Sequence, residues 1–104
     1  MSDIDRLRLI RTPGIGPITW RQLIARFGDA ARALEALPDL ARRGGGKAPT
    51  PPDPRAIERE MKQVAGLGAR YLFLGDPDYP PLLAELENAP PAIIVRGDGA
   101  LARR

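Results

Sequence analysis

Cysteine and histidine are both absent from this chain of 104 residues. Their absence excludes disulfides, thiol nucleophiles, imidazole acid–base chemistry and zinc sites of the usual kind. An enzyme built on this sequence would have to work with Ser, Asp, Glu, Lys, Arg and Tyr alone. We therefore expect no catalytic residue, no cofactor and no metal site.

Long apolar runs are also missing. No run approaches the roughly eighteen residues that a membrane-spanning helix needs, and the first five residues, Met-Ser-Asp-Ile-Asp, are acidic. We expect neither a signal peptide nor contact with a membrane, and a cytoplasmic location. The length fits one domain of ordinary size, or one domain with a fragment of a second.

The charge balance is only weakly basic. Sixteen Lys and Arg against thirteen Asp and Glu give a formal net charge of +3, and fourteen of the sixteen bases are Arg. Arginine favours bidentate phosphate contacts, but a genome rich in G and C produces the same bias without selection for binding. The charge by itself does not identify a nucleic-acid binder.

Proline and glycine are abundant and lie mainly at segment ends. The clearest case is the stretch Thr-Pro-Gly-Ile-Gly-Pro-Ile-Thr at residues 12–19. Gly14 and Gly16 permit positive φ or close backbone approach, while Pro13 and Pro17 suit the entrance or first turn of a helix. The stretch predicts the turn of a helix-hairpin-helix unit, with backbone amides exposed beside a helix N-terminus.

Apolar residues at helical spacing surround this hairpin. Trp20, Leu23, Ile24 and Phe27 form one stripe, and Ser2, Asp29 and Asp53 are placed as N-caps. We expect helices over residues 3–11, from the hairpin to 27, over 29–38 and over 54–66, with a short separate turn over 38–43.

The remaining segments read as a loop and a small α/β unit. Residues 44–52 (GGGKAPTPP) carry no periodicity and predict a flexible loop. Short apolar runs at 71–74 and 92–95 predict buried strands, with two helical turns at 81–87 between them. We expect a β-α-β unit with parallel strands and a right-handed crossover. Two parallel strands form a poor sheet, so the unit would be the edge of a larger one.

Two motifs in this α/β unit carry a family resemblance. Residues 79–83 read Tyr-Pro-Pro-Leu-Leu, and residues 88–97 read Asn-Ala-Pro-Pro-Ala-Ile-Ile-Val-Arg-Gly. They resemble the DNA-processing protein A (DprA, or Smf) family. The hairpin, followed by Phe27-Gly28, is similar to that family's N-terminal domain, which is like sterile-alpha-motif (SAM) and helix-hairpin-helix folds. The residues of the family motif, with structural roles, are Tyr79, Pro80, Leu83, Ala89, Pro90 and Gly97.

The resemblance implies a mainly α fold: a SAM-like helical bundle over 1–68, and the start of a truncated Rossmann-like domain over 69–104. It also implies a cytoplasmic protein of natural transformation that binds and protects incoming single-stranded DNA and helps load the recombinase RecA. In that family the DNA site lies mainly in the Rossmann-like domain, whose Gly-Ser-Arg phosphate-binding loop follows soon after the strand that ends at Gly97. The sequence stops at Arg104 without that loop, so we expect an N-terminal piece of such a protein.

The hairpin itself has two interpretations. In one, backbone amides capture DNA phosphate, with these candidate contact residues: Gly14, Ile15, Gly16, Thr19, Arg11 and Arg21. In the other, it is only a tight turn between packed helices. Pro17 removes one donor, and Trp20 stands where DNA-binding hairpins usually carry a small residue.

Other chemistry-bearing residues have alternatives of the same kind. Trp20 and Phe27 are either stacking platforms for bases or core residues, and their shared helical face favours the core. Tyr79 is either a hydroxyl anchor for its Pro-flanked loop or an interface residue. Two charged clusters also have alternatives. For the acids the pattern favours turn and cap chemistry over a metal site; these residues are Asp76, Asp78, Glu85 and Glu87. The bases either lie in a solvated loop or contact nucleic acid; these residues are Arg42, Arg43 and Lys47.

Three functions of different class follow for the helical domain. It is an auxiliary DNA-contacting module, a module that docks a regulatory protein partner, or a scaffold for the Rossmann-like domain. Exposed arginines around the hairpin would favour the first, and an exposed apolar patch would favour the second.

Overall fold

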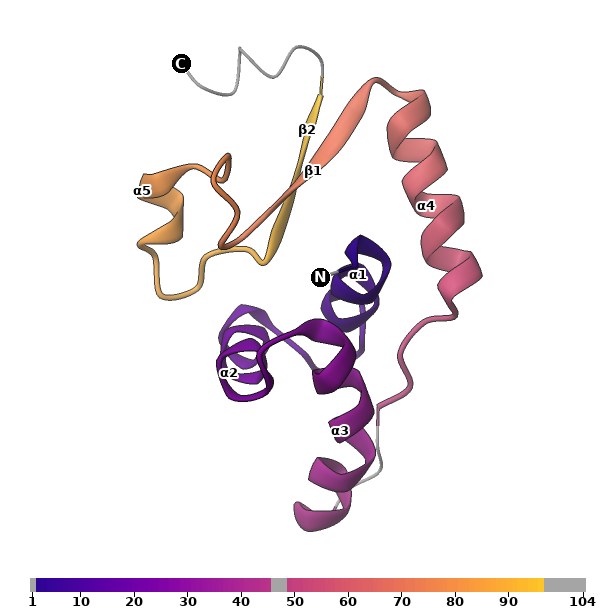
Figure 1. The fold of residues 1–104 in the computed structure, drawn as a ribbon, viewed down its shortest axis with the longest axis vertical. Helices are drawn as coiled ribbons and strands as arrows, with labels where there is room; N and C mark the ends of the chain where they lie inside the picture. The colour runs from indigo at the N-terminus through magenta and orange to yellow at the C-terminus, as the bar shows by residue number, and fades with distance from the viewer. Residues whose placement is uncertain (1, 46–48, 97–104) are drawn as a thin grey trace.

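The computed structural model describes residues 2–45 and 49–96 (Figure 1). This part of the chain is mainly helical, as predicted, with one small two-stranded sheet. In chain order the elements are α1 (Asp3–Ile10), α2 (Pro17–Phe27), α3 (Ala30–Arg43), α4 (Pro54–Gly66), β1 (Ala69–Phe73), α5 (Pro81–Ala84) and β2 (Ala92–Arg96). The expected loop at 44–52 lies partly outside the described residues. Lys47 and Gly97 also lie outside them.

The predicted N-caps begin three of the helices. The Asp29 carboxylate accepts from the Arg32 amide at 2.8 Å, and the Asp53 carboxylate accepts from the Arg55 amide at 2.8 Å. Ser2 accepts more weakly from the third residue on, at 3.5 Å. Each cap satisfies an amide that the helix itself leaves unpaired, so these starts are encoded locally.

A core cluster joins the first three helices. Its buried members are Leu9, Trp20, Leu23, Ala30, Ala33 and Leu37, and Ile24 and Phe27 pack against it. Trp20 is only 4% exposed, so the core interpretation of this side chain is confirmed over base stacking. The small alanines of α3 allow α1 and α2 to approach it closely.

The predicted boundary at Pro38 is wrong, because α3 continues through it to Arg43. Proline in a helix interior removes one backbone hydrogen bond and crowds the preceding turn. Here the Pro38 ring lies on the exposed side of the helix, while Leu37 and Leu40 on either side of it pack on the core. Tertiary packing therefore outweighs the local helix-stop signal.

The predicted parallel β-α-β unit is also wrong in strand direction. β1 and β2 pair antiparallel, in register from Ala69 opposite Arg96 to Phe73 opposite Ala92. A parallel crossover needs a helix long enough to return to the start of the first strand. The intervening segment holds only the four-residue α5, since prolines at 77, 80, 81, 90 and 91 interrupt it, so the chain re-enters beside the end of β1.

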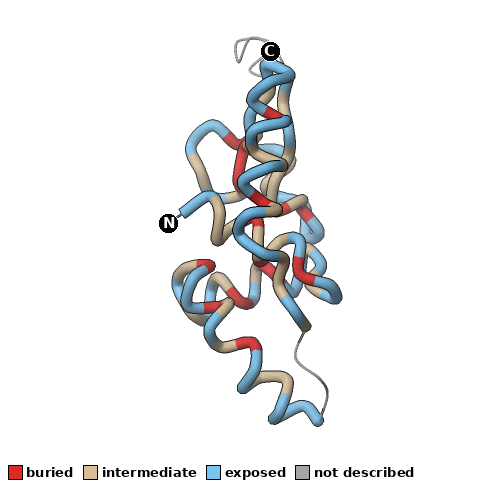
Figure 2. The backbone as a smooth tube through the Cα atoms, turned by 90° about the vertical axis from the view of Figure 1, so that its right-hand side faces the viewer, coloured by how far each residue is buried: buried red, intermediate tan, exposed pale blue. Residues whose placement is uncertain are grey.

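A second core cluster attaches the sheet to the helices. Leu7 of α1, Ile57 of α4 and Phe73 of β1 are buried together. Figure 1 shows the sheet above α1, with α4 to one side and α5 to the other. The division at residue 68 stays a prediction, and this cluster draws residues from both sides of it. Figure 2 shows buried positions in the middle of the molecule, whereas the lower end of α3 is mostly exposed.

Candidate nucleic-acid and protein interface

The hairpin is a tight turn that rests on a buried threonine. Thr12 is 2% exposed, and its hydroxyl donates to the Arg8 carbonyl at 2.7 Å. Gly14 follows with φ +84°, a conformation that side chains disfavour, and the Ile15 amide donates back to the Thr12 carbonyl at 3.2 Å. Gly16 has φ −91° and open space around it, so only Gly14 is required by the backbone conformation.

The first turn of α2 is the part of the hairpin suited to an anion. Gly16 occupies the N-cap position and supplies no side-chain cap, and Pro17 follows. The next amides, those of Ile18 and Thr19, thus have no capping partner among the described residues, and Thr19 is exposed. Unpaired amides at a helix N-terminus attract phosphate. The Ile15 amide, by contrast, is already used inside the turn.

Arg11, a predicted phosphate contact, is engaged elsewhere. Its guanidinium donates to both carboxylate oxygens of Glu60 in α4, at 3.1 and 3.3 Å. The Tyr71 hydroxyl of β1 donates to the same carboxylate at 2.5 Å. Burial raises the pKa of Glu60, but the hydrogen bonds from Arg11 and Tyr71 and the Arg11 charge outweigh it and lower that pKa below 4.5. The pKa of Tyr71 is raised, chiefly by burial and to a lesser extent by its hydrogen bond to Glu60.

Arg21, the other predicted basic contact, reaches from α2 to the α5 segment. It donates to the Ala84 carbonyl at 2.9 Å and, more weakly, to those of Leu86 and Glu87 at 3.3 and 3.5 Å. The structure therefore brings Gly14, Ile15, Gly16 and Thr19 together but turns Arg11 and Arg21 to intramolecular partners.

An apolar groove lies against the hairpin instead. It has a volume of about 430 Å³ and runs between the hairpin, α2 and the second half of α3. Its lining residues are Pro13, Gly14, Ile15, Thr19, Leu23, Leu37, Leu40, Ala41 and Pro49. Three of the four hairpin residues named above as DNA contacts thus form one wall of a groove that suits aliphatic side chains. The sequence pattern gave no signal of this groove, because its far wall depends on α3 continuing past Pro38.

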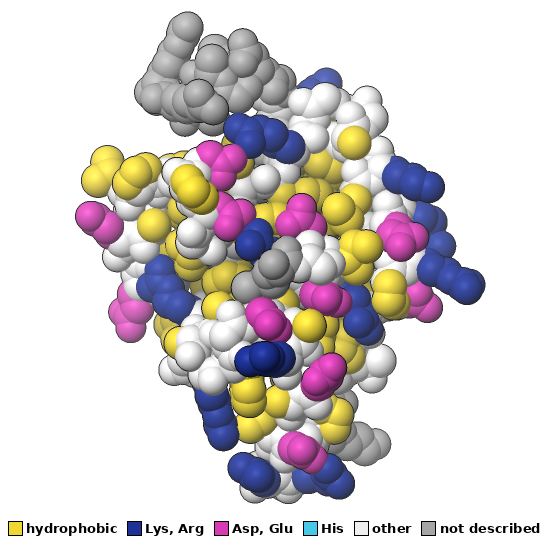
Figure 3. All heavy atoms as spheres, viewed as in Figure 1, with side chains coloured by type: hydrophobic (Ala, Val, Ile, Leu, Met, Phe, Trp, Pro, Cys, Tyr) yellow, Lys and Arg dark blue, Asp and Glu magenta, His cyan; other side chains and the backbone are white. Residues whose placement is uncertain are grey.

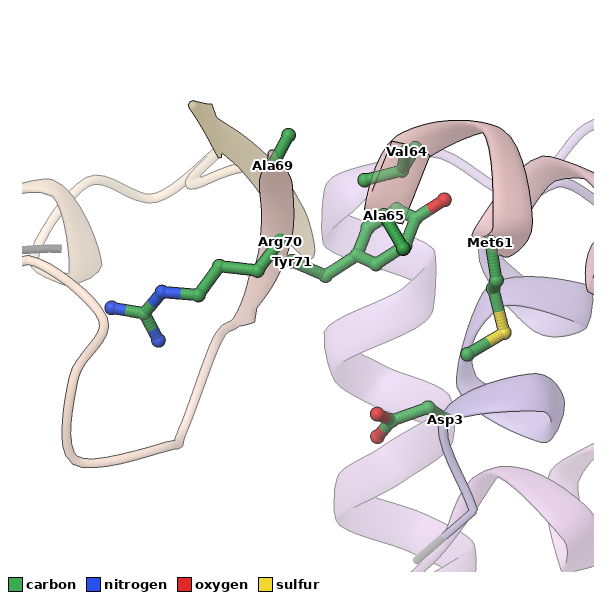
Figure 4. Close-up of a pocket in the computed structure, with 7 residues that line it drawn as sticks. All are labelled: Asp3, Met61, Val64, Ala65, Ala69, Arg70 and Tyr71. Carbon is green, nitrogen blue, oxygen red and sulfur yellow. The ribbon is translucent and has the colours of Figure 1, made fainter. Parts of the chain in front are cut away.

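A smaller hollow of about 230 Å³ is lined by residues of α4 and β1 and by Asp3. Figure 4 shows the Tyr71 ring turned toward Val64 and Ala65, and the Arg70 side chain pointing away from α4. Arg70 pairs with Asp78 at 2.8 Å, and Asp76 pairs with Arg6 at 2.8 Å. These two acids, weighed above as metal ligands, hold ion pairs between segments.

Tyr79 and its neighbours form the best-packed part of the family motif. The Tyr79 hydroxyl donates to the Pro90 carbonyl at 2.8 Å, and the side chain is 4% exposed. Ala89 is buried, Pro80 precedes α5, and burial raises the pKa of Tyr79. This geometry fits the anchor interpretation, because the hydrogen bond joins the two ends of the α5 segment. A residue that contacts a partner protein would instead be exposed at the surface.

Comparison with known proteins places the chain in a family. A family model described as the DprA-like N-terminal HHH domain matches residues 1–63, and no curated protein matches the chain. In the part of the chain that the structure describes, no helix has the length and apolar character to cross a membrane. Because the model covers α1, the hairpin, α2, α3 and most of α4, more than half of the chain, this protein belongs to the DprA family and carries its N-terminal HHH domain.

Proposed function

We propose that this chain is the N-terminal module of a cytoplasmic DNA-processing protein that binds and protects incoming single-stranded DNA and helps load RecA. The family match over residues 1–63 carries the proposal. In this role the main DNA site belongs to a Rossmann-like domain rather than to these residues, and the module has no catalytic task.

Within that role the hairpin is a secondary DNA contact. The uncapped start of α2 and the exposed Gly14, Gly16 and Thr19 support it. Because Arg11 and Arg21 are engaged elsewhere, the contact uses backbone amides and little side-chain charge. Such binding is weak, indifferent to base sequence and sensitive to salt.

Amide shifts test this contact directly. The ¹⁵N-labelled chain is titrated with oligothymidine and with a short duplex at low and at physiological salt. We expect the amides of Gly16, Ile18 and Thr19 to shift with both probes, and less at the higher salt. Thr19→Glu, which adds a negative charge at the uncapped helix start, should abolish the shifts, and Gln22→Glu one turn later should not. Unmoved hairpin amides at low salt would refute the contact.

A second function is docking of a protein partner. The apolar groove beside the hairpin favours it, because its walls are aliphatic and the nearby Arg11 and Arg21 are occupied. Aliphatic grooves of this size receive side chains of peptides and helices more readily than nucleotides. The partner in this function is a regulatory protein.

A further inference from the structure

The groove beside the hairpin has a neighbour on the other side of Leu40. A hollow of about 170 Å³ lies there, and Leu40 lines both spaces. The lining residues of this second hollow are Arg26, Phe27, Ala36, Asp39, Leu40 and Arg43. The second half of α3 is therefore flanked by an apolar groove and by a hollow that carries two guanidinium groups.

The charge at this end of the molecule is unbalanced. Arg42 pairs with Asp39, which neutralises that carboxylate. Arg26 and Arg43 are exposed and have no carboxylate partner among the described residues, and Arg26 lies 5.2 Å from the centre of the Phe27 ring. Figure 3 shows several basic side chains at the lower end of the molecule, with fewer acidic ones among them and hydrophobic surface beside them. An apolar groove next to a hollow that carries two guanidinium groups complements a ligand that is apolar on one side and acidic on the other.

We propose that the groove between the hairpin and the second half of α3 binds an acidic amphipathic segment of a partner protein. Aliphatic side chains of that segment enter between Ile15, Leu23 and Leu40, and its carboxylates meet Arg26 and Arg43. The inference rests on the second function proposed above, protein docking, and makes the chemistry of the partner specific. It does not depend on whether the hairpin contacts DNA.

Nucleic acid fits this groove less well. Bases bind single-strand sites by stacking on aromatic faces. The groove beside the hairpin is lined mainly by aliphatic residues and by no aromatic one. In the second hollow Phe27 is partly buried against the core, with Arg26 over its ring. Peptide side chains such as Leu and Ile match the aliphatic walls.

Three probes separate the possibilities. Two synthetic helical peptides share one leucine face and carry either Glu or Lys at every polar position, and the third probe is oligothymidine. Each is titrated into the ¹⁵N-labelled full chain. We expect the Glu peptide to give saturable shifts at Ile15, Leu23 and Leu40, and the Lys peptide to bind at least about tenfold more weakly.

Matched variants locate the site. Arg26→Glu with Arg43→Glu should weaken the Glu peptide about tenfold and strengthen the Lys peptide, whereas Arg59→Glu on the exposed side of α4 should change neither. Ala41→Glu places a charged side chain in the groove and should abolish binding. Its control, Ala31→Glu, makes the same change at an exposed position near the start of α3.

Each contrary result is distinct. Equal binding of the Glu and Lys peptides would overturn the acidic specificity and leave protein docking in place. No saturable shift with either peptide would overturn both the inference and the docking function of this groove. Shifts at the groove with oligothymidine that the double Arg variant removes would assign the groove to nucleic acid and likewise overturn the inference.

Discussion

At the scale of single residues, the Glu60 carboxylate is a point where distant parts of the chain meet. It receives Arg11, which follows α1, and Tyr71 of β1, while itself standing on α4. Arg11 binds it through two parallel N–H···O contacts, a geometry that lysine could not reproduce. One carboxylate thus holds together three elements that lie far apart in sequence.

The pH dependence of stability should report this network. The pKa of Glu60 is lowered on folding, so its contribution is fully present above the ordinary carboxyl value of 4.5 and is lost as the pH falls through the lower folded value. We expect Glu60→Gln to cost about 0.5–1.5 kcal/mol at neutral pH, and the difference from wild type to vanish in acid. Urea unfolding across the acidic range measures both.

Glu58→Gln serves as the control, since Glu58 is exposed on the same helix. It should leave stability and its pH profile nearly unchanged. A constant difference between the Glu60→Gln variant and wild type down to the most acidic pH would show that the carboxylate charge plays no part.

Residue-scale interactions differ in how far the sequence predicts them. The capping contacts of Asp29 and Asp53 lie within three residues of the donor, so a local pattern suffices. Arg11 and Arg21 bond to partners 49 and 63 residues away, and no local pattern fixes such a pairing. For that reason the hairpin was predictable as a turn, whereas the engagement of its two arginines was not.

At the scale of elements, α3 contains a proline in its interior that destabilises the helix. Pro38 lies inside this helix and can donate no hydrogen bond to the carbonyl one turn back. The turns after it nevertheless supply Leu40 and Ala41 to the groove. The missing hydrogen bond therefore lies next to the turns that form the groove wall.

Replacing Pro38 should stabilise the second half of α3, which forms one wall of the groove. We expect Pro38→Ala to slow amide exchange at residues 40–43 by an amount equivalent to about 1–3 kcal/mol of local opening free energy. Pro54→Ala is the control, because Pro54 occupies the first turn of α4, where no helical bond is lost. Unchanged exchange in the Pro38→Ala variant would mean that the proline costs this helix nothing.

Element boundaries and strand direction were predictable to different degrees. Helix starts follow from caps and helix ends from residues such as Gly28, which adopts φ +90° after α2. The strands were expected at nearly the observed residues, since short β-branched and aromatic runs are a local signal. Their antiparallel direction depends on how the prolines and the Tyr79–Pro90 hydrogen bond fold the intervening segment, which periodicity does not encode.

At the scale of the whole molecule, the sheet completes the helical core. Phe73 is buried with Leu7 and Ile57, and the Arg6 guanidinium stands 4.8 Å from its ring centre. Arg6 is itself held by Asp76 at 2.8 and 3.3 Å. The 69–96 unit is thus packed into the helices as part of their core.

Truncating Phe73 should destabilise the helices as well as the sheet. We expect Phe73→Ala to cost about 3–5 kcal/mol and Phe73→Leu about 1 kcal/mol. The fluorescence of Trp20, the sole tryptophan, should report the loss although Trp20 belongs to the other core cluster. Leu82→Ala, at a side chain 80% exposed, is the matched control and should be near neutral. If the unfolding transition reported by Trp20 fluorescence is the same in Phe73→Ala as in wild type, the helices and the sheet are two independently stable units.

The ion pair between Arg6 and Asp76 spans 70 residues of sequence, and that span has a kinetic consequence. Isolated helices form in about a microsecond, but contacts this distant must wait for the loss of chain entropy that closing a long loop requires. We therefore expect the rate of folding to be set by the delivery of β1 to α1, not by helix formation. In a chain made from its N-terminus, the cluster of Leu7 and Ile57 cannot close before Phe73 has been added, so we expect the helices to gain their full stability only after β1 is made.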